Sequence, residues 1–126
     1  LPIYFLPPPS LSPSILSVGT WEDRERFPSK QTTSVGQPDL WAHGENIISV
    51  LSPNYNFSLQ NRSKSSIVDH SYIAMSGASM ATPMVSGMAA CLLERFPNLT
   101  PSQVKQRLCA AAEKNGGLLE PSCLPE

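Results

Sequence analysis

The sequence predicts an α/β chain, with short strands in its first half and two helices in its second. Two apolar runs with β-branched residues, Ile15–Gly19 and Ile47–Leu51, have the length and composition of strands and stop at turn-forming residues. From about Ser79, small and apolar residues recur every three or four positions, which is typical of a helix. At 126 residues, the chain is long enough for one domain or for part of a larger one.

The first half of the chain alternates strand candidates with turns. Ile15–Gly19 is expected to be a buried strand, and Trp21–Lys30 a charged loop or turn. Glycine and proline in the stretch 34–44, SVGQPDLWAHG, indicate turns. After the second candidate strand, a polar connection from about Asn54 to Asp69 is rich in Asn and Ser. We expect it to be a surface loop, within which a hairpin is an open option.

The first helix is expected to be largely buried, because its apolar stripe is wide. The stripe is formed by Met84, Val85, Met88, Ala89, Leu92 and Leu93. Pro83 is tolerated near the start of this helix, since the first-turn amides have no intrahelical acceptors to lose. Pro97 is expected to end the helix.

The second helix has a recognisable start. Thr100 is placed as its N-cap, Pro101 as its first helical residue, and Gln103 stands three residues after the cap, which together resemble a capping box. The helix is expected to run to about Lys114 and to stop at Asn115–Gly117.

The two ends of the chain are expected to lie outside the folded part. Residues 1–13 contain five prolines and are predicted to be extended or disordered. The alternative is a polyproline ligand at Pro7–Pro9, which is disfavoured because no basic residues flank these prolines. No basic stretch precedes an apolar one, so this segment does not resemble a secretory signal, and a start at Leu1 suggests a truncated or processed chain. Residues 115–126 are predicted to be a tail.

Charge and hydropathy exclude two classes of partner. Nine Lys and Arg against ten Asp and Glu give a formal net charge of −1, which leaves no basic field for nucleic acid or anionic lipid. The apolar runs are far shorter than the roughly 20 residues that span a bilayer. We therefore predict neither a nucleic-acid partner nor a membrane span.

Three cysteines, Cys91, Cys109 and Cys123, are odd in number and lack metal-ligand spacing. This number argues against a complete disulfide framework. Cys91 and Cys109 are interpreted as small apolar residues within helices, and Cys123 as a free thiol in the tail.

The most informative segment is Ser76–Pro83, SGASMATP, where a loop becomes a helix. A serine at a helix N-terminus has its hydroxyl beside unpaired backbone amides and the positive end of the helix dipole, which favour an oxyanion. Gly77 and Ala78 leave room for a substrate backbone, and Ala81 allows close packing behind. Composition alone favours the alternative, in which Ser79 is only a helix cap.

The stretch SGASMATPMVSG resembles the serine motif of the subtilisin-like peptidases, G-T-S-M-A-x-P followed by a small-residue helix. Three further stretches resemble the same family in order: ILSVGT, the segment from Pro38-Asp39-Leu40 to Ile47, and Leu99–Lys105. The resemblance covers residues 14–114, which we assign to the C-terminal portion of a subtilase catalytic domain. It implies a mainly parallel sheet flanked by helices on both faces, of which this chain supplies only that portion.

By this resemblance, Ser79 is the nucleophile of a serine endopeptidase that hydrolyses polypeptide substrates through an acyl-enzyme. A histidine, an aspartate that orients it and an asparagine oxyanion donor belong upstream of the matching stretch. Residues 1–78 contain no Asp-(T/S)-G, His-Gly-(T/S)-His or Ala-Ala-Gly-Asn motif. We therefore expect an incomplete fragment that is inactive alone and is completed by the N-terminal part of the same domain.

Two histidines of this sequence are candidates for the missing base. His43 stands where the family has the proline of an A-P-G turn, and Asp69-His70-Ser71 holds the right residue types only as chain neighbours, which cannot face one another. We expect neither to be catalytic. His70 is expected to be solvated, at the rim of a substrate groove.

The sequence departs from the family's pattern at two positions. Ala78 replaces the family's Thr, which removes one auxiliary hydrogen bond to an oxyanion, and His43 replaces the turn proline. The sequons at Asn56, Asn61 and Asn98 are interpreted as surface polar residues. No cofactor is needed for the chemistry; the family commonly holds structural calcium, for which no ligands can be assigned.

The sequence also allows a non-catalytic function. The chain can instead be a catalytically dead subtilase remnant that serves as a binding or structural module. Because a parallel sheet needs both faces covered, we expect this stretch alone to be marginally stable and to expose apolar surface from the Ser79–Glu94 helix. The parent family is mostly secreted, with intracellular members, so the compartment stays unassigned.

Overall fold

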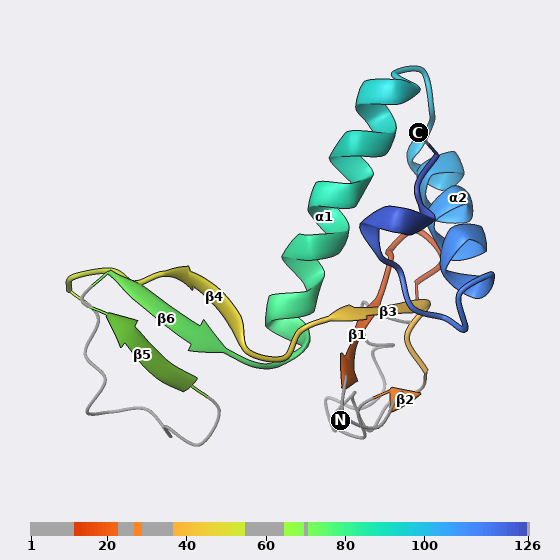
Figure 1. Ribbon diagram of the computed structural model, residues 1–126. Helices are drawn as coiled ribbons and strands as arrows, with labels where there is room; N and C mark the ends of the chain where they lie inside the picture. The colour runs from red at the N-terminus through yellow and green to blue at the C-terminus, as the bar shows by residue number, and fades with distance from the viewer. Residues whose placement is uncertain (1–11, 23–26, 29–36, 55–64, 70, 126) are drawn as a thin grey trace, which may run out of the picture.

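The computed structural model describes residues 12–22, 27–28, 37–54, 65–69 and 71–125. Its strands are β1 (Val18–Glu22), β2 (Phe27–Pro28), β3 (Leu40–His43), β4 (Ile47–Val50), β5 (Ser65–Asp69) and β6 (Tyr72–Met75). Its helices are α1 (Ala78–Arg95), α2 (Pro101–Glu113) and a short 3-10 helix, η5 (Pro121–Cys123). Figure 1 shows two parts: a body that contains β1, β3, both long helices and the C-terminal segment, and an antiparallel sheet of β4, β5 and β6 that projects from it.

The body is built on a small sheet of order β2-β1-β3. β1 and β3 run parallel, in register from Val18 opposite Leu40 to Trp21 opposite His43, and β2 pairs antiparallel with the end of β1. A further parallel bridge joins Trp41 to Leu118. With α1 packed on β1 and β3 and α2 packed on β3, the predicted α/β class is confirmed.

The core lies between this sheet and the two helices. Leu40 and Ala42 point from β3 into it, and the stripe of α1 that faces them is spaced by four, three and four residues. The buried cluster comprises Leu40, Ala42, Ala81, Val85, Met88, Leu92, Leu108, Ala112 and Leu119. At about 25 cal/mol per Å² of apolar area removed from water, burial of such side chains is the main stabilising term of the body.

The segment after α2, predicted to be a tail, packs against the body. Leu118 and Leu119 are 7% and 1% exposed, and Leu119 N donates to Trp41 O while Trp41 N donates to Gly117 O. The turn before them uses Gly116 at φ 70° and Gly117 at φ 98°, a region that favours glycine. Residues 117–119 therefore add a short parallel stretch beside β3.

The antiparallel sheet has the order β4-β6-β5. Val50 lies opposite Tyr72 and Ile48 opposite Ala74, while the β5–β6 pairing contains a register shift between Ile67 and Asp69. The expectation of a surface loop up to Asp69 is wrong for residues 65–69, which form β5. The hairpin expected within Asn54–Asp69 stays a prediction, because residues 55–64 lie outside the described residues; β5 pairs antiparallel with β6, which follows that range.

The strand predictions were partly right. Ile47–Leu51 is confirmed as β4, whereas the first strand begins three residues later than Ile15 and continues through Trp21 into the predicted charged loop. The interpretation of Leu40–His43 as part of a turn region is wrong. That run is a strand because β1 on one side and Leu118 on the other supply its backbone partners, which local sequence does not reveal.

The helices are confirmed in extent. α1 ends at Arg95, with Phe96 as its C-cap, just before Pro97, and α2 begins with the predicted capping box, in which Thr100 Oγ1 accepts from Gln103 N and Gln103 Oε1 accepts from Thr100 N. The expectation that α1 is largely buried is wrong in this chain. Met84 is 42% exposed and Leu93 38%, because the sheet and α2 cover only one stripe of the helix.

All three cysteines are free. Cys109 packs against the core as predicted, and burial raises the pKa of its thiol, with the Asp39 charge adding to the rise. Cys91 is exposed on α1, so its interpretation as an apolar filler is wrong. Cys123 lies half-buried in η5 with its Sγ 3.7 Å from Leu118 O.

Some predictions fall outside the described residues. These are the interpretations of the lead at positions 1–11, of His70, and of the sequons at Asn56 and Asn61. Asn98 is exposed between the two helices, as expected of a surface residue. Within the described residues, neither α1 nor α2 combines the length and hydropathy needed to cross a bilayer.

Candidate active site

Ser79 is the second residue of α1 and is exposed. The N-cap is Gly77, and no side chain caps the helix. The interpretation of Ser79 as a helix cap is therefore wrong, because a capping serine stands outside the helix and accepts from an amide two or three residues later. Among the described residues, neither the hydroxyl nor the amide of Ser79 has a hydrogen-bond partner.

The turn before Ser79 depends on a glycine conformation. Gly77 has φ 145° and ψ 171°, a region that L-residues with a side chain rarely adopt. Gly77 O accepts from Met80 N at 2.9 Å and from Ala81 N at 3.2 Å, and these two bonds close the first turn of α1. The chain therefore arrives extended and enters the helix within one residue, which leaves the Ser79 side chain on the outer surface.

Residues 44–46, which follow β3, are hydrogen-bonded to this turn. Gly77 N donates to Gly44 O at 2.8 Å, and Asn46 N donates to Ser76 Oγ at 2.9 Å. Asn46 is the only described non-glycine residue with positive φ, at 52°, and this left-handed turn aims its amide at Ser76. The end of β3 and the start of α1 are thus joined directly beside Ser79.

Gly44 permits the close approach of these segments. A Cβ at this position would lie 2.7 Å from Gly77 O and 3.0 Å from both Ala81 Cβ and Thr20 Cγ2. Contacts shorter than 3.0 Å to backbone are not tolerated, so any larger residue would push the Ser79 turn away from β3. Gly44 and Ser76 were not identified as site residues from the sequence, although the Gly-Glu-Asn turn signal after His43 could have indicated the position.

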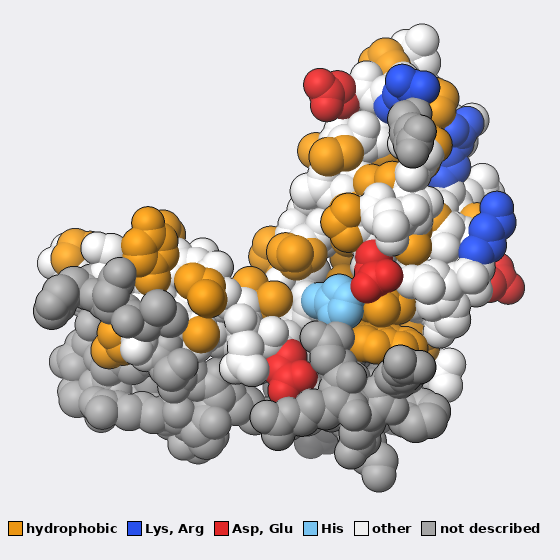
Figure 2. Space-filling view, in the orientation of Figure 1, with side chains coloured by type: hydrophobic (Ala, Val, Ile, Leu, Met, Phe, Trp, Pro, Cys, Tyr) orange, Lys and Arg blue, Asp and Glu red, His pale blue; other side chains and the backbone are white. Residues whose placement is uncertain are grey.

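His43 ends β3 and pairs with the C-terminal segment. Its Nε2 lies 2.7 Å from Glu120 Oε1, and Asn115 Nδ2 donates to the other oxygen of Glu120 at 3.2 Å. The hydrogen bond from His43 is the largest cause that lowers the pKa of Glu120 below its ordinary value, and Asn115 lowers it further against partial burial. The side chains of His43 and Glu120 are 32% and 34% exposed, and Figure 2 shows a histidine beside an acidic side chain on the surface of the body.

This geometry gives His43 a local structural role. The carboxylate that would orient its ring is Glu120, which belongs to the segment packed beside β3, and the pair anchors that segment. The sequence-based expectation that His43 is not the general base stays a prediction. His70 lies outside the described residues.

Asp39 organises the other end of β3. Its Oδ2 accepts from the amide and hydroxyl of Ser17 at 2.8 and 3.0 Å, and Lys105 Nζ lies 3.2 Å away. Partial burial raises the pKa of Asp39, but the hydrogen bonds from Ser17 and Lys105 outweigh it, so the pKa lies below its ordinary value. The Asp of the Pro38-Asp39-Leu40 stretch therefore links β1, β3 and α2 and touches no reactive group.

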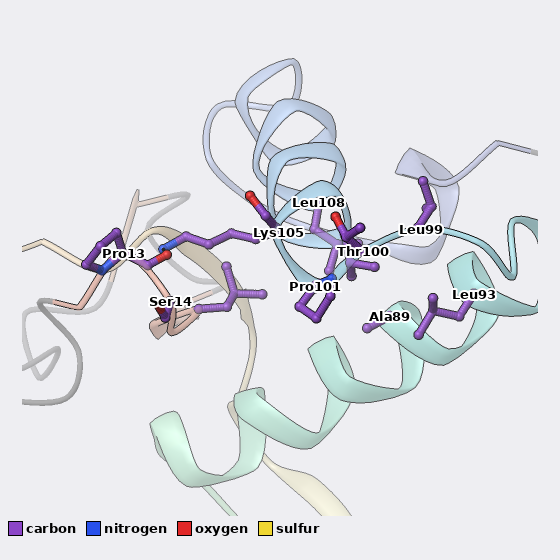
Figure 3. A pocket seen from close by; sticks show the side chains of 12 residues that line it. Pro13, Ser14, Ala89, Leu93, Leu99, Thr100, Pro101, Lys105 and Leu108 are labelled. Carbon is purple, nitrogen blue, oxygen red and sulfur yellow. The ribbon is translucent and has the colours of Figure 1, made fainter.

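A hollow of about 760 Å³ lies between α1, α2 and residues 13–16. Figure 3 shows Leu93 and Ala89 from α1 on one side and Leu99, Pro101 and Leu108 on the other, with Lys105 reaching toward Pro13. Lys105 Nζ donates to Pro13 O and Ile15 O. Ser79 is not among the lining residues, so this hollow is separate from the nucleophile turn.

Within the described part of the chain, no three His, Cys, Asp or Glu side chains gather closely enough to hold a metal ion.

The fold and the turn define a class of protein: an α/β chain that presents an exposed serine in the first turn of a half-buried helix. The Subtilase family model matches residues 6–122, and the chain belongs to this family. The recognised resemblance is thereby confirmed, and at family level the function is that of a serine peptidase.

Curated relatives agree with this assignment. The chain is 40% identical over 119 aligned residues to the serine protease AprX of Bacillus subtilis (strain 168), which covers 84% of this chain and 26% of AprX. It is 35% identical over 96 residues to the subtilisin-like protease SBT3.9 of Arabidopsis thaliana, covering 76% of this chain and 11% of that protein. Mycosin-4 of Mycobacterium tuberculosis is 39% identical over 98 residues, 20% of its length. The chain therefore spans about a quarter or less of these relatives.

Proposed function

We propose that Ser79 is the nucleophile of a serine endopeptidase and that this chain supplies the nucleophile half of the catalytic centre. The observation that carries the proposal is the position of Ser79: it is exposed, in the first turn of α1, two residues after Gly77, whose φ is 145°. The chain's membership of the subtilase family supports a polypeptide as the substrate.

In this proposal, Ser79 Oγ attacks the scissile carbonyl carbon while a general base removes its proton. The carbonyl oxygen becomes an oxyanion, which the unpartnered Ser79 amide stabilises, since first-turn amides have no intrahelical acceptors. Collapse of the tetrahedral intermediate expels the amine, which takes the proton, and leaves an acyl-enzyme on Ser79. Water then attacks the acyl carbon and releases the free acid.

The rest of the machinery is assigned to polypeptide outside these 126 residues. The base, its orienting carboxylate and a side-chain oxyanion donor belong to the N-terminal part of a subtilase domain. Ala78 beside Ser79 carries no hydroxyl, so its side chain offers no additional hydrogen bond to the oxyanion. An unassisted serine hydroxyl is a weak nucleophile, and the 126-residue chain is therefore inactive by itself.

A fluorophosphonate probe tests this division of roles, because it labels only an activated serine. The chain alone is expected to label no more than its Ser79→Ala variant. Mixed with AprX from which the stretch matching this chain has been deleted, the chain is expected to label, and Ser79→Ala is not. Labelling of the isolated chain would overturn the proposed incompleteness, and labelling of Ser79→Ala in the mixture would overturn the role of Ser79.

A further inference from the structure

A second hollow lies between α2 and the residues that follow η5, and Ser79 is not among the residues that line it. Its volume is about 410 Å³, which is within the range of ligand-binding pockets. Its lining includes Leu92 of α1 and Leu108 of α2, which are 3% and 0% exposed, so core side chains form its base. Leu124 and Pro125, which follow η5, add further apolar surface. The hollow therefore offers an apolar base outside the candidate active site.

The side of α2 that lines this hollow carries two cations with small residues between them. Arg107, Ala110, Ala111 and Lys114 all line the hollow, and their spacing of three and four residues places them on one side of the helix. Arg107 and Lys114 are seven residues apart, which is two helical turns and about 10 Å along the axis. The two alanines end at Cβ, so they leave the hollow open between two long cationic side chains.

Within the described part of the chain, no carboxylate neutralises these two cations. Lys105, which precedes them on α2, is paired with Asp39, whereas Arg107 and Lys114 are exposed and form no ion pair there. Arg107 Cζ lies 4.6 Å from the centroid of the Phe96 ring, a cation–π contact that holds the guanidinium without removing its charge. Figure 2 shows Lys and Arg side chains gathered on the side of the body where α2 lies.

The helix dipole gives only one of these cations a structural explanation. Lys114 is the C-cap of α2, where a positive charge favours the negative end of the dipole. Arg107 lies two turns earlier, outside the last turn in which the dipole acts, so it has no such role. A positive charge at both ends of an apolar hollow is complementary to a ligand that is negative at both ends and apolar between them.

An extended peptide supplies this pattern in a simple form. Side chains at positions i, i+2 and i+4 of an extended chain lie on one side and span about 13 Å. With an acidic residue at each end and an apolar one in the middle, both carboxylates come within reach of the flexible Arg107 and Lys114 side chains while the apolar side chain enters the hollow. A nucleic acid would need a wider basic surface, and the formal net charge of the chain is −1.

We propose that this hollow binds an extended acidic peptide segment in which two carboxylates flank an apolar side chain. The residues that carry the proposal are Leu92, Arg107, Ala110, Lys114, Leu124 and Pro125. Leu92 lies thirteen residues after Ser79 on α1, which is about 20 Å at 1.5 Å per residue. The binding therefore goes beyond the proposed peptidase chemistry and does not depend on the role of Ser79.

The test is a fluorescence anisotropy titration of a labelled peptide, Gly-Glu-Ser-Leu-Ser-Glu-Gly, with the 126-residue chain in low-salt buffer. Binding is expected to be saturable and to weaken as salt is added, since exposed ion pairs are screened. Replacing both Glu of the peptide by Gln is expected to weaken binding about tenfold. Replacing its Leu by Ser is expected to weaken binding about threefold or more, because the apolar side chain no longer enters the hollow.

Charge variants of the chain locate the site. Arg107→Gln and Lys114→Gln are each expected to weaken binding about threefold, in the range of single exposed ion pairs. The matched control is Arg95→Gln, since Arg95 is an exposed cation at the end of α1 that does not line the hollow; this variant is expected to bind like the unmodified chain. Ser79→Ala is likewise expected to bind normally, which separates this site from the candidate active site.

A further variant tests the hollow without changing a charge. Ala110 is exposed on α2, and Ala110→Leu fills the space between the two cations with a residue that favours helix. Its circular dichroism is expected to match that of the unmodified chain, while peptide binding falls about tenfold. Unchanged binding by this variant would contradict the proposal.

Three further results would overturn the proposal. One is the absence of saturable binding of the acidic peptide by the unmodified chain. Another is an equal loss of binding in Arg95→Gln and Arg107→Gln, which would show a diffuse effect of charge. The last is tighter binding of a labelled single-stranded DNA than of the peptide, which would assign the two cations to nucleic acid.

Discussion

The body of this chain is held by contacts between residues far apart in sequence, whereas the antiparallel sheet is held by pairing among its own three strands. In the body, Lys105 reaches Ile15 and Leu119 pairs with Trp41. In the sheet, the described buried side chains are Ile73 and Ala74, and Val50 is 77% exposed. The body is thus folded by its core, while the antiparallel sheet leaves apolar side chains exposed.

The largest difference in free energy of unfolding is expected when one apolar side chain in each part is replaced by alanine. Leu108 is 0% exposed in the body, and Leu108→Ala is expected to lower the free energy of unfolding by about 3 kcal/mol through lost burial and a cavity. Val50→Ala in the sheet is expected to cost about 0.5 kcal/mol or less, since its side chain is already in water. Urea denaturation followed by circular dichroism measures both. Equal losses would show that the sheet face is part of the folding core.

A smaller effect on stability is expected when alanine replaces each of two glycines, Gly44 and Gly87, which differ in their surroundings. Gly44→Ala is expected to destabilise the chain by about 2 kcal/mol, because its Cβ would meet Gly77 O at 2.7 Å. Gly87→Ala, in the open on α1, is expected to stabilise by roughly 0.5–1 kcal/mol, since alanine restricts the unfolded chain and favours helix. The same denaturation experiment compares them. A neutral Gly44→Ala would mean that the Ser79 turn can move away from β3.

Local patterns in the sequence predicted the parts of the fold that local interactions determine. The side chains of Thr100 and Gln103 each accept a hydrogen bond from the other residue's backbone amide, so four residues were enough to predict the start of α2. Gly77 and Ser79 stand in a motif short enough to be recognised as a unit. Leu40–His43 was missed as a strand because its partners are β1 and Leu118, more than 20 and 70 residues away in sequence.

The sequence predicted only the part of the candidate site that lies within one short segment of the chain. The sequence indicated Ser79 and the helix behind it, but not Gly44 and Asn46, which hold the turn from the end of β3 through two long-range hydrogen bonds. The expectation that α1 is largely buried was wrong, whereas the expectation that this stretch exposes apolar surface from the Ser79–Glu94 helix is confirmed by Met84 and Leu93, which are 42% and 38% exposed. In this chain only one stripe of α1 is buried, because the sheet and α2 cover only that side of the helix.

The smallest effect on stability is expected from removing the charge of Asp39, whose carboxylate contacts Ser17 and Lys105. Asp39→Asn is expected to lower the free energy of unfolding by about 1 kcal/mol at pH 7, since the side chain is 30% exposed and the interaction is partly screened. The folded-state pKa of Asp39 lies below its unfolded value, so its stabilising contribution is present above an unfolded pKa of about 3.9 and is lost as pH falls through the folded pKa.

The difference between the unmodified chain and Asp39→Asn is therefore expected to vanish in strong acid, where Asp39 is protonated in both folded and unfolded states. Subtracting the two denaturation profiles isolates this carboxylate from Glu120, whose pKa is also lowered and whose contribution is common to both chains. Glu113→Gln, at the exposed end of α2, removes the same charge without touching the network. If the Asn variant stayed less stable at low pH by the same amount, shape rather than charge would account for the role of Asp39 in joining β1, β3 and α2.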